Sequence, residues 1–460
     1  MQAWMIPWVS WHTVAVVAGL LLYVVATQGL QQRRPPTAAI AWVILIALLP
    51  YVGVPLFLLF GSRKRGRAGP PPGHRDGVAP VPPAPADPLA ALAQALNLPP
   101  AAAHGSIRLH TDGTVALQAL LEVIDAARER LHICTYLIGH DALGAALLER
   151  VRARVAAGVT VRILVDGVGG LSSWPMVRRL RACGAQVAWF VPPLHRPLHG
   201  RTNLRNHRKL VVADAGRVWM GGRNLAAEYF EGSATAAAWA DLSLDTDGPL
   251  AAQLDGIFVS DWDFATGETV AVPAAPADGR PAGSRAQAVP SGPDYADDTL
   301  HAILLLACYR AQSTIAIATP YFVPDESLLQ ALCLAARRGV AVRVLLPARS
   351  NHRVADLARG RALQQAAAAG VQVQLYPAML HAKLVIIDES WLLLGSANFD
   401  SRSLFLNYEL MIALRDPATL AGTRAWFEAS AAVATPWTAP APGMLRNFGD
   451  GLLLWLAFQM

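Results

Sequence analysis

The sequence has little charge. Only 16% of its 460 residues are Asp, Glu, Lys or Arg, whereas an average soluble domain has about 25%. No charged residue occurs before Arg33, and hydrophobic residues make up 53% of the chain. This composition excludes a disordered protein and indicates membrane segments together with a large buried core. The net charge of +6 suits anionic lipid or nucleic acid and specifies neither.

Cysteine and lysine are also scarce. The four cysteines are far apart and form no C-x-x-C pair, which argues against a disulfide framework or a zinc site. No His, Asp or Glu set has the spacing of metal ligands, so we expect neither a metal nor a cofactor. The only lysines are Lys64, Lys209 and Lys383. Arginine occupies the other basic positions, histidine aside.

Two uncharged runs open the chain. Residues 1–65 are predicted to form a membrane hairpin, with transmembrane helices at about 11–30 and 38–60. A cleaved signal peptide and a buried core helix are the alternatives, but a signal peptide needs a basic start. Basic residues are more numerous after the second run than between the runs, which predicts a cytoplasmic catalytic region by the positive-inside bias. These residues are Arg63, Lys64, Arg65 and Arg67, against Arg33 and Arg34.

The rest of the chain divides into two similar segments. Residues 66–104 and 271–286 are predicted linkers rich in Pro, and 438–460 form an apolar tail. Between them, 105–270 and 287–437 each contain an apolar strand, a helix that stops at Gly, and a V-x-V-R strand. Strand, helix and strand in this order predict an α/β class fold, with two tandem repeats that each have a mixed or parallel sheet.

Each repeat carries the motif H-x-K-x4-D, followed by a Gly-led turn that ends in Asn. One motif of this kind is weak evidence, but two at equivalent places in a repeat are strong. The motif residues are His207, Lys209 and Asp214 in the first repeat and His381, Lys383 and Asp388 in the second. The turns contribute Asn224 in the first repeat and Ser396 and Asn398 in the second.

These residue types fit phosphodiester chemistry without a metal ion. On a strand, residues two apart share a face, so each His should project together with its Lys. If the repeats pack face to face, both pairs enter one cleft. One histidine can then attack phosphorus while the other protonates the leaving oxygen. The lysines and asparagines would stabilise the equatorial oxygens. The alternative is two buried His–Lys pairs with no reaction, which is unfavourable because a buried ammonium ion loses hydration.

The sequence resembles the phospholipase D superfamily, and more closely its bacterial cardiolipin synthases with an N-terminal membrane hairpin. The resemblance rests on RNHRKLVVAD, GGRNLAAEYF, DWDFATGE, VPSGPD, TPYFVPDESLLQAL and LHAKLVIIDESWLLLGSANFDSRSLFLNYEL. It implies two phospholipase D-like repeats that share one active site and a phosphatidyl-histidine intermediate, with His207 as the nucleophile. It further implies that two phosphatidylglycerols condense to cardiolipin and glycerol, in a multi-pass protein of the bacterial inner membrane.

The resemblance also implies roles for further residues. Asp241 and Glu409 would orient the two histidines, each within its own repeat, and Glu228 is a weaker candidate. Asp214 and Asp388 would be more structural than reactive. Asn224, Ser396 and Asn398 would bind substrate phosphate. One departure is Ala240, where such synthases usually have Arg, which puts one phosphate or headgroup contact in doubt.

Other interpretations remain open from the sequence. The same machinery serves phospholipases, phosphatidylserine synthases and nucleases, and an inactive membrane-tethered lipid-binding protein is a further alternative. A hairpin without an aromatic and basic stripe argues against nucleic acid. We expect phosphatidylglycerol and membrane lipids as partners, and a monomer could be active because one chain carries both motifs. In the loop before the first motif, Arg201 and Arg205 are candidates for lipid phosphate; His195 and His199 are predicted loop residues near the cleft mouth.

Overall fold

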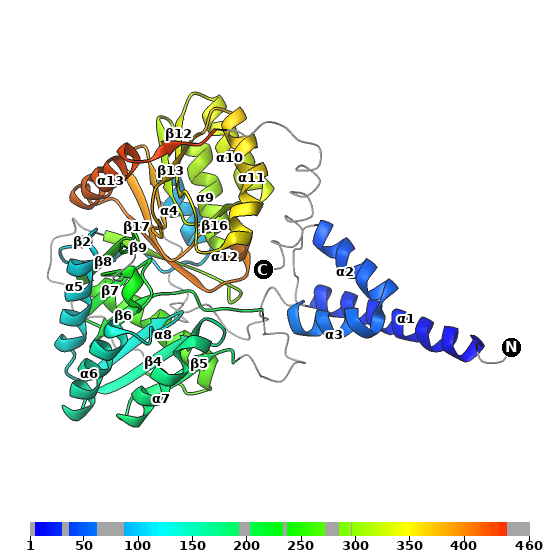
Figure 1. Cartoon of the computed structure of the whole chain (residues 1–460), viewed down its shortest axis with the longest axis horizontal. Helices are drawn as coiled ribbons and strands as arrows, with labels where there is room; N and C mark the ends of the chain where they lie inside the picture. Colours follow the sequence, from blue (N-terminus) through cyan, green and yellow to red (C-terminus); the bar gives the residue numbers. More distant parts are fainter. Residues whose placement is uncertain are drawn as a thin grey trace.

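We examined a computed structural model, which describes residues 5–29, 36–61, 87–192, 203–232, 237–271, 285–295 and 297–438. The N-terminal region consists of α1 (Met5–Gly29), α2 (Pro36–Leu48) and α3 (Pro50–Phe60), which stand apart from the two sheets in Figure 1. A small apolar cluster joins these three helices and contains Tyr23, Trp42, Ile46 and Phe57. The aromatic rings of Tyr23 and Trp42 contact that of Phe57, with centroids 5.1 and 5.4 Å away.

The prediction of a single helix over 38–60, bent by Pro50, Gly53 and Pro55, was wrong, because this region forms two helices. The helix is interrupted at Leu49, whose φ of −135° and ψ of 63° are not helical. Pro50 causes this break, because a proline disfavours the helical conformation of the residue before it. In the part of the chain that the structure describes, no helix is both long and apolar enough to cross a membrane.

The first repeat is a seven-stranded mixed sheet. Strand β3 pairs in parallel with β4, and β4 with β5, whereas β6, β7, β8 and β2 follow with antiparallel pairing. In sheet order the strands are β2 (Arg108–His110), β8 (Ser243–Asp247), β7 (Arg217–Gly221), β6 (Leu210–Ala213), β3 (Arg130–Thr135), β4 (Thr160–Asp166) and β5 (Gln186–Phe190). Its helices are α5 (Gly113–Ala126), α6 (Ala142–Ala156), α7 (Trp174–Ala182) and α8 (Pro249–Thr266).

The second repeat has the same strand order, extended by a short strand at each edge. Its strands are β1 (Ala102–Ala103), β9 (Arg285–Ser291), β17 (Glu409–Leu414), β15 (Trp391–Gly395), β14 (Leu384–Ile387), β10 (Thr314–Ala318), β12 (Ala341–Pro347), β13 (Gln372–Tyr376) and β18 (Thr435–Pro436). A separate pair comprises β11 (Phe322–Val323) and β16 (Phe399–Asp400). The helices are α9 (Thr299–Arg310), α10 (Glu326–Arg337), α11 (Arg353–Ala368), α12 (Ser401–Phe405) and α13 (Pro417–Ala432). The predicted duplicated α/β fold with mixed sheets is confirmed.

Helix ends follow the predicted glycine signals. After α6 and α10 the chain turns at Gly158 and Gly339, whose φ values of 85° and 93° are readily adopted only by glycine. The strands that follow, β4 and β12, are mostly apolar, and each is paired with a neighbouring strand on both sides. Because these strands are covered on both faces, a continuous apolar run is the pattern expected of them.

A shared core holds the two repeats together. It combines residues from the inner faces of both sheets with apolar side chains of α8 and α13. A second core lies between the first sheet and α5, α6 and α7, and a third between the second sheet and α9, α10 and α11. Figure 1 shows the two sheets side by side with their helices outside. The strand ends that carry the motif histidines therefore meet at the boundary between the repeats.

Part of the first predicted linker is folded onto the second repeat. Residues 88–95 form α4 (Pro88–Ala95), whose Ala93 is buried in the core beside α9. Strand β1 pairs with β9 of the second sheet. The helix α4 and the strand β1, which precede the first repeat in the sequence, thus pack on the second repeat. Residues 66–86 of this linker, most of the linker at 271–286 and nearly all of the C-terminal tail lie outside the described residues.

Asp214 and Asp388 hold the turns that end their motifs. Both adopt a left-handed backbone, with φ of 53° and 49°, which short polar side chains tolerate. The carboxylate of Asp214 accepts backbone N–H bonds from Arg128, Glu129 and Arg130 at 2.8–2.9 Å. The carboxylate of Asp388 accepts the equivalent three, from residues 312–314, and a bond from the Ser313 hydroxyl. The motif's Asp therefore fastens one hairpin to the start of a neighbouring strand.

Asp388→Asn should lower the free energy of unfolding by ~1–2 kcal/mol, because one amide oxygen replaces a carboxylate that binds several donors. Burial opposes ionisation of Asp388, but the donated hydrogen bonds outweigh it and hold its pKa below the usual value. This stabilisation is complete above the unfolded pKa and is lost as the pH falls through the folded pKa. Urea unfolding in detergent should give the variant a lower free energy of unfolding than the wild type at pH 7. This difference should become smaller below about pH 4. Glu129→Gln is the control, since its exposed carboxylate has no such donors; an equal deficit in the control would contradict this role.

Candidate active site

The two motif histidines are positioned by hydrogen bonds across the repeats. Their segments precede β6 and β14 and are not part of these strands, so the strand prediction was wrong there. Instead, the His207 N–H donates to the carbonyl oxygen of Tyr408 at 2.9 Å. The His381 N–H donates to the carbonyl oxygen of Ala240 at 2.7 Å. Each motif is thus attached to the residue that comes just before the other repeat's candidate carboxylate.

The orienting carboxylates are exchanged between the repeats. Nδ1 of His207 lies 3.1 Å from the carboxylate of Glu409, and Nδ1 of His381 lies 2.7 Å from Oδ2 of Asp241. The expectation that each repeat orients its own histidine was therefore wrong. The cause is the backbone pairing, since Tyr408 and Ala240 bring the following acid to the opposite motif. Ala240 contributes only backbone groups to this pairing, and any residue type can supply these.

Glu409 is held from several sides. The Ser396 hydroxyl donates to it at 2.5 Å, and the amide of Asn407 donates at 3.3 Å. Ser396, predicted to bind phosphate, is therefore engaged behind the histidine, where its hydroxyl also accepts a bond from the Leu410 N–H. These contacts fix the orientation of Glu409 and, through it, the His207 ring.

Arg208, between the first His and Lys, adds a further support. Its Nε donates to the Glu409 carbonyl oxygen at 3.0 Å and its Nη1 to the Asp261 carboxylate at 2.5 Å. A third bond reaches the Ser291 carbonyl oxygen at 3.2 Å. This buried guanidinium ties α8 to β9 and β17 and so joins the repeats. The second repeat has Ala382 at the equivalent place, so the two halves of the site are not equally braced.

Both motif lysines are buried beside their histidines. Nζ of Lys209 donates to the His207 carbonyl oxygen at 2.7 Å. Nζ of Lys383 donates to the His381 carbonyl oxygen and lies 2.7 and 3.0 Å from the two ring nitrogens. Burial lowers the pKa of Lys209 to about 8 and that of Lys383 to about 7. The ammonium groups therefore lack a full set of anionic partners in the absence of substrate.

The histidines favour the neutral form. Burial, and then the neighbouring Lys383 ammonium, lowers the pKa of His381 to about 3. Burial also lowers the pKa of His207, although the Glu409 carboxylate opposes this shift. Asp241 and Glu409 stay ionised because their histidine contacts outweigh the desolvation that would raise their pKa values. An anion that enters between these rings would favour their protonation.

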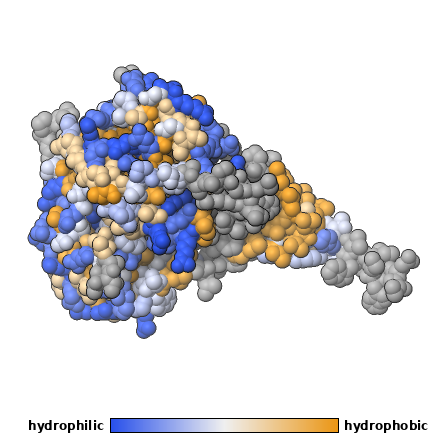
Figure 2. Space-filling model, turned by 45° about the horizontal axis from the view of Figure 1, so that its top comes forward, coloured by the Kyte–Doolittle hydropathy of each residue, from blue (hydrophilic) through white to orange (hydrophobic). Residues whose placement is uncertain are grey.

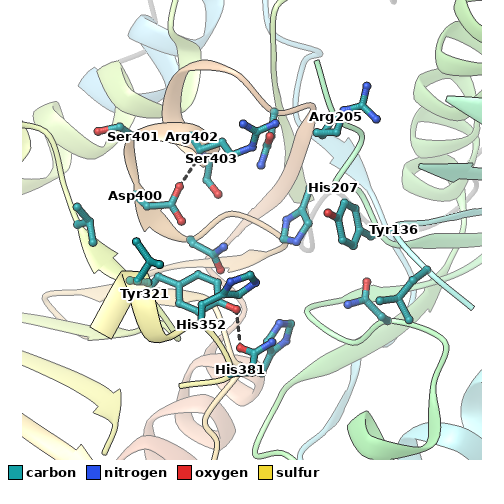
Figure 3. A pocket seen from close by; sticks show the side chains of 18 of the residues that line it. Tyr136, Arg205, His207, Tyr321, His352, His381, Asp400, Ser401, Arg402 and Ser403 are labelled. Carbon is teal, nitrogen blue, oxygen red and sulfur yellow. Dashed lines mark hydrogen bonds between the residues drawn. The ribbon is translucent and has the colours of Figure 1, made fainter. Parts of the chain in front are cut away.

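Both histidines line one cavity of about 350 Å³, seen from close by in Figure 3. Of the predicted phosphate-binding residues, Asn224 and Asn398 line it and Ser396 does not. The Tyr136 ring meets the edge of His207 with centroids 5.3 Å apart, and Tyr229 meets His381 at 5.0 Å. Glu228 also lines the cavity, but the carboxylates that bind the two histidine rings are those of Glu409 and Asp241.

Sequence analysis missed several cavity residues. Arg205 was a candidate for lipid phosphate and lines the cavity, as do residues not singled out: Tyr229, Asn351, His352, Asp400, Arg402 and Asn407. Most come from loops and from the stretch after GSAN, where no spacing rule marks them. A tyrosine follows the first apolar strand of each repeat, Tyr136 in one and Tyr321 in the other, and both line the cavity. This repetition is the one sequence signal for these lining residues. His195, His199 and Arg201 lie outside the described residues. Within the described ranges, no group of three His, Cys, Asp or Glu side chains could hold a metal ion.

Comparison with known proteins decides the family. A model described as "Cardiolipin synthase, PLD-like domain" matches residues 120–262 and 305–430, together more than half of the chain. The chain belongs to the cardiolipin synthase family of phospholipase D-like proteins. A model described as "Phospholipase_D-nuclease N-terminal" matches residues 16–62. The recognition of this family from the motifs is thereby confirmed.

Curated relatives are similar over almost the whole length. Cardiolipin synthase A of Pseudomonas aeruginosa is 31% identical over 439 residues, which covers 91% of this chain and 89% of the relative. Cardiolipin synthase A of Pseudomonas putida is 32% identical over 418 residues, with 86% and 87% covered. The fold is similar to that of phosphatidylserine synthase from Haemophilus influenzae, with a TM-score of 0.59 at 16% identity, covering 80% of this chain and 96% of that chain.

Glu409→Gln should lower the pKa of His207 further and leave His381 nearly unchanged, because Glu409 favours the protonated ring of His207. The matched variant Asp241→Asn should affect His381 and spare His207. Imidazole ¹⁵N shifts of histidine-labelled protein in detergent, assigned with His207→Ala and His381→Ala, measure both effects. The opposite pattern would show that each repeat orients its own histidine.

Proposed function

We propose that this chain is a cardiolipin synthase that transfers a phosphatidyl group from one phosphatidylglycerol to another and releases glycerol. The observation that carries the proposal is the pair of oriented histidines on one cavity, in a chain about 30% identical to cardiolipin synthases over about 90% of its length. Phosphodiester exchange needs a nucleophile and a proton donor, and two imidazoles supply both.

In the proposed first step, Nε2 of His207 attacks phosphorus and His381 gives a proton to the departing glycerol oxygen. The P–N bond forms as the P–O bond breaks, which leaves a phosphatidyl-histidine. In the second step His381 takes a proton from the headgroup hydroxyl of a second phosphatidylglycerol, whose oxygen displaces His207. Cardiolipin leaves and the site returns to its starting state. The energy of one phosphodiester is exchanged for that of another, so no nucleotide is needed.

Local geometry supports His207 as the nucleophile. Its Nδ1 is occupied by Glu409, while Nε2 has no hydrogen-bond partner among the described residues. By contrast, both nitrogens of His381 lie within hydrogen-bond distance of Lys383. The low pKa of His381 opposes protonation before substrate binds. A phosphodiester anion would raise this pKa and attract the Lys383 ammonium away from the ring, which prepares His381 to act as an acid.

We also propose that the N-terminal helices associate with the membrane, as two membrane-embedded segments. Figure 2 shows a continuous apolar surface over this part of the molecule. Large apolar side chains are exposed on each helix, including Trp11 at 71%, Val25 at 68% and Leu48 at 69%. A water-exposed apolar surface of this kind is unfavourable, whereas lipid contact removes it from water. The predicted cytoplasmic location of the repeats follows from the basic residues after the second segment.

A reporter fused after Met460 should behave as a cytoplasmic protein. The basic residues among 63–67 favour a cytoplasmic location for the chain that follows the second apolar segment. Alkaline phosphatase and fluorescent protein fusions measure this in a bacterial host. Replacing Arg63, Lys64, Arg65 and Arg67 by Gln should reduce the bias, since the loop at Arg33 and Arg34 then carries more charge. Strong periplasmic phosphatase activity of the unmodified fusion would reverse the proposed topology.

Purified protein in vesicles of phosphatidylglycerol should form cardiolipin and glycerol in equal amounts, and excess glycerol should reverse the reaction. Saturating chelator should leave the rate within about twofold, because two histidines and two lysines supply the acid, base and positive charge. Mass spectrometry of the lipids measures the products. Phosphatidic acid as the only product would identify a phospholipase, and loss of activity restored by one divalent ion would contradict the proposed mechanism.

His207→Ala and His381→Ala should each reduce turnover by at least about 10³-fold, because both steps need both rings. They should differ in the intermediate. With a donor that has a good leaving group, His381→Ala should accumulate a phosphatidyl adduct on His207, since no base activates the acceptor. His207→Ala should form none. Peptide mass spectrometry under conditions that preserve acid-labile phosphohistidine locates the adduct, and its presence on the His381 peptide would reverse the roles.

A further inference from the structure

Asp400 has a charge that opposes the proposed substrate. Its side chain lines the cavity that holds His207 and His381. One carboxylate oxygen accepts a bond from the Ser403 N–H at 2.7 Å, as the N-cap of α12. Burial raises the pKa of Asp400, and the His207 ring and the Arg402 guanidinium oppose this shift. No ion pair joins the carboxylate to any residue that the structure describes. A phosphodiester is anionic, so an unpaired carboxylate on the same cavity does not assist phosphate binding and calls for a hydrogen-bond donor.

Other side chains that line the same cavity add further acceptors. The Asn407 amide nitrogen donates to Glu409 at 3.3 Å, and because a carboxylate only accepts, this contact fixes the orientation of the Asn407 amide. Its Oδ1 is then left as a buried acceptor without a partner, and Oδ1 of Asn398 is in the same state. All three residues line the cavity. Buried acceptors are normally satisfied, so this group points to a ligand that carries hydroxyl donors.

The cavity's cationic side chains lie elsewhere on its wall. Arg205 and Arg402 line it with nitrogen donors, and Arg402 also bonds to Asn203 at 3.0 Å. In the view of Figure 3, both guanidinium groups lie above His207, whereas Asp400 lies across the cavity from Tyr136. The wall thus offers both nitrogen donors suited to phosphate and oxygen acceptors suited to hydroxyl groups.

We infer that Asp400, together with Asn407 on the same cavity, forms a subsite for the non-reacting hydroxyl of a vicinal diol, as carried by the glycerol headgroup of the acceptor lipid. This inference rests on the proposed function. The carboxylate accepts a hydrogen bond from the second hydroxyl and so directs the terminal hydroxyl towards the phosphatidyl-histidine. No bond to Asp400 forms or breaks. Its role is to select the acceptor, because water and simple alcohols lack a second hydroxyl at the right spacing.

Competition between two small acceptors tests this. Full-length protein, supplied with phosphatidylglycerol in vesicles, receives 1,2-propanediol and 1-propanol at equal concentrations. The two phosphatidyl alcohols are quantified by mass spectrometry. The wild type should favour the diol by about tenfold, which is the range of one hydrogen bond to a charged group. Asp400→Asn should reduce this preference to about twofold or less, since a neutral amide accepts more weakly. The ratio does not depend on how much enzyme is active.

A matched control removes the same charge from another helix cap. Asp416 caps α13 through the Thr419 N–H, outside the cavity. Asp416→Asn should keep the diol preference of the wild type. Both Asn variants retain a good N-cap, and Asp400→Ser, also a good N-cap, serves if Asp400→Asn fails to fold. Retention of the diol preference in the Asp400 variant, or its absence from the wild type, would overturn the inference.

The remaining outcomes separate the inference from the proposed function. A parallel loss of both alcohol products in Asp400→Asn, with an unchanged ratio, would show a role in the chemical step and overturn the subsite. A wild type that transfers to the diol with preference but makes no cardiolipin would contradict the proposed function and support the subsite.

Discussion

The exchange of carboxylates between the repeats is the constraint on which the site depends. His207 is oriented by Glu409 and His381 by Asp241, so neither half contains a complete histidine–carboxylate pair. The same two segments carry the backbone bonds that join the repeats, at Tyr408 and Ala240. The orientation of the histidine rings and the docking of the repeats therefore depend on the same two segments. A shift of one sheet against the other would break the backbone pairing and both histidine–carboxylate hydrogen bonds together.

Burial acts in the same direction on the two kinds of basic group in the site, since it lowers the pKa of the histidines and of the lysines. It makes the imidazoles neutral, which a nucleophile requires, and it weakens the hold of the lysines on their protons. Both effects arise because few water molecules solvate these groups. A bound phosphodiester would replace the missing solvation of the ammonium ions with its own charge. The lipid anion would therefore complete the electrostatics of the cavity.

Much of this arrangement was predictable from the sequence, for a physical reason. Strand and helix periods, glycine helix ends and a repeated motif are local signals, and they identified the duplicated α/β fold and both histidines. The pairing of Glu409 with His207 was not predictable, since residues 202 positions apart meet only through tertiary packing. The break at Leu49 was underestimated, although Pro50 marks it. Asp400 resembles an ordinary helix cap in sequence, and only its place on the cavity distinguishes it.

The shared strand order and the exchanged pairs have an evolutionary consequence. If a single repeat had existed as a separate chain, its histidine would have lacked its carboxylate, and only a twofold-symmetric pair of chains could have completed the site. Fusion of two such chains would keep the geometry and free each half to change independently. Arg208 opposite Ala382 is a difference of this kind, since only one half now carries the guanidinium brace. Two equivalent histidines could thereby acquire separate duties, something that an exactly symmetric ancestor could not encode.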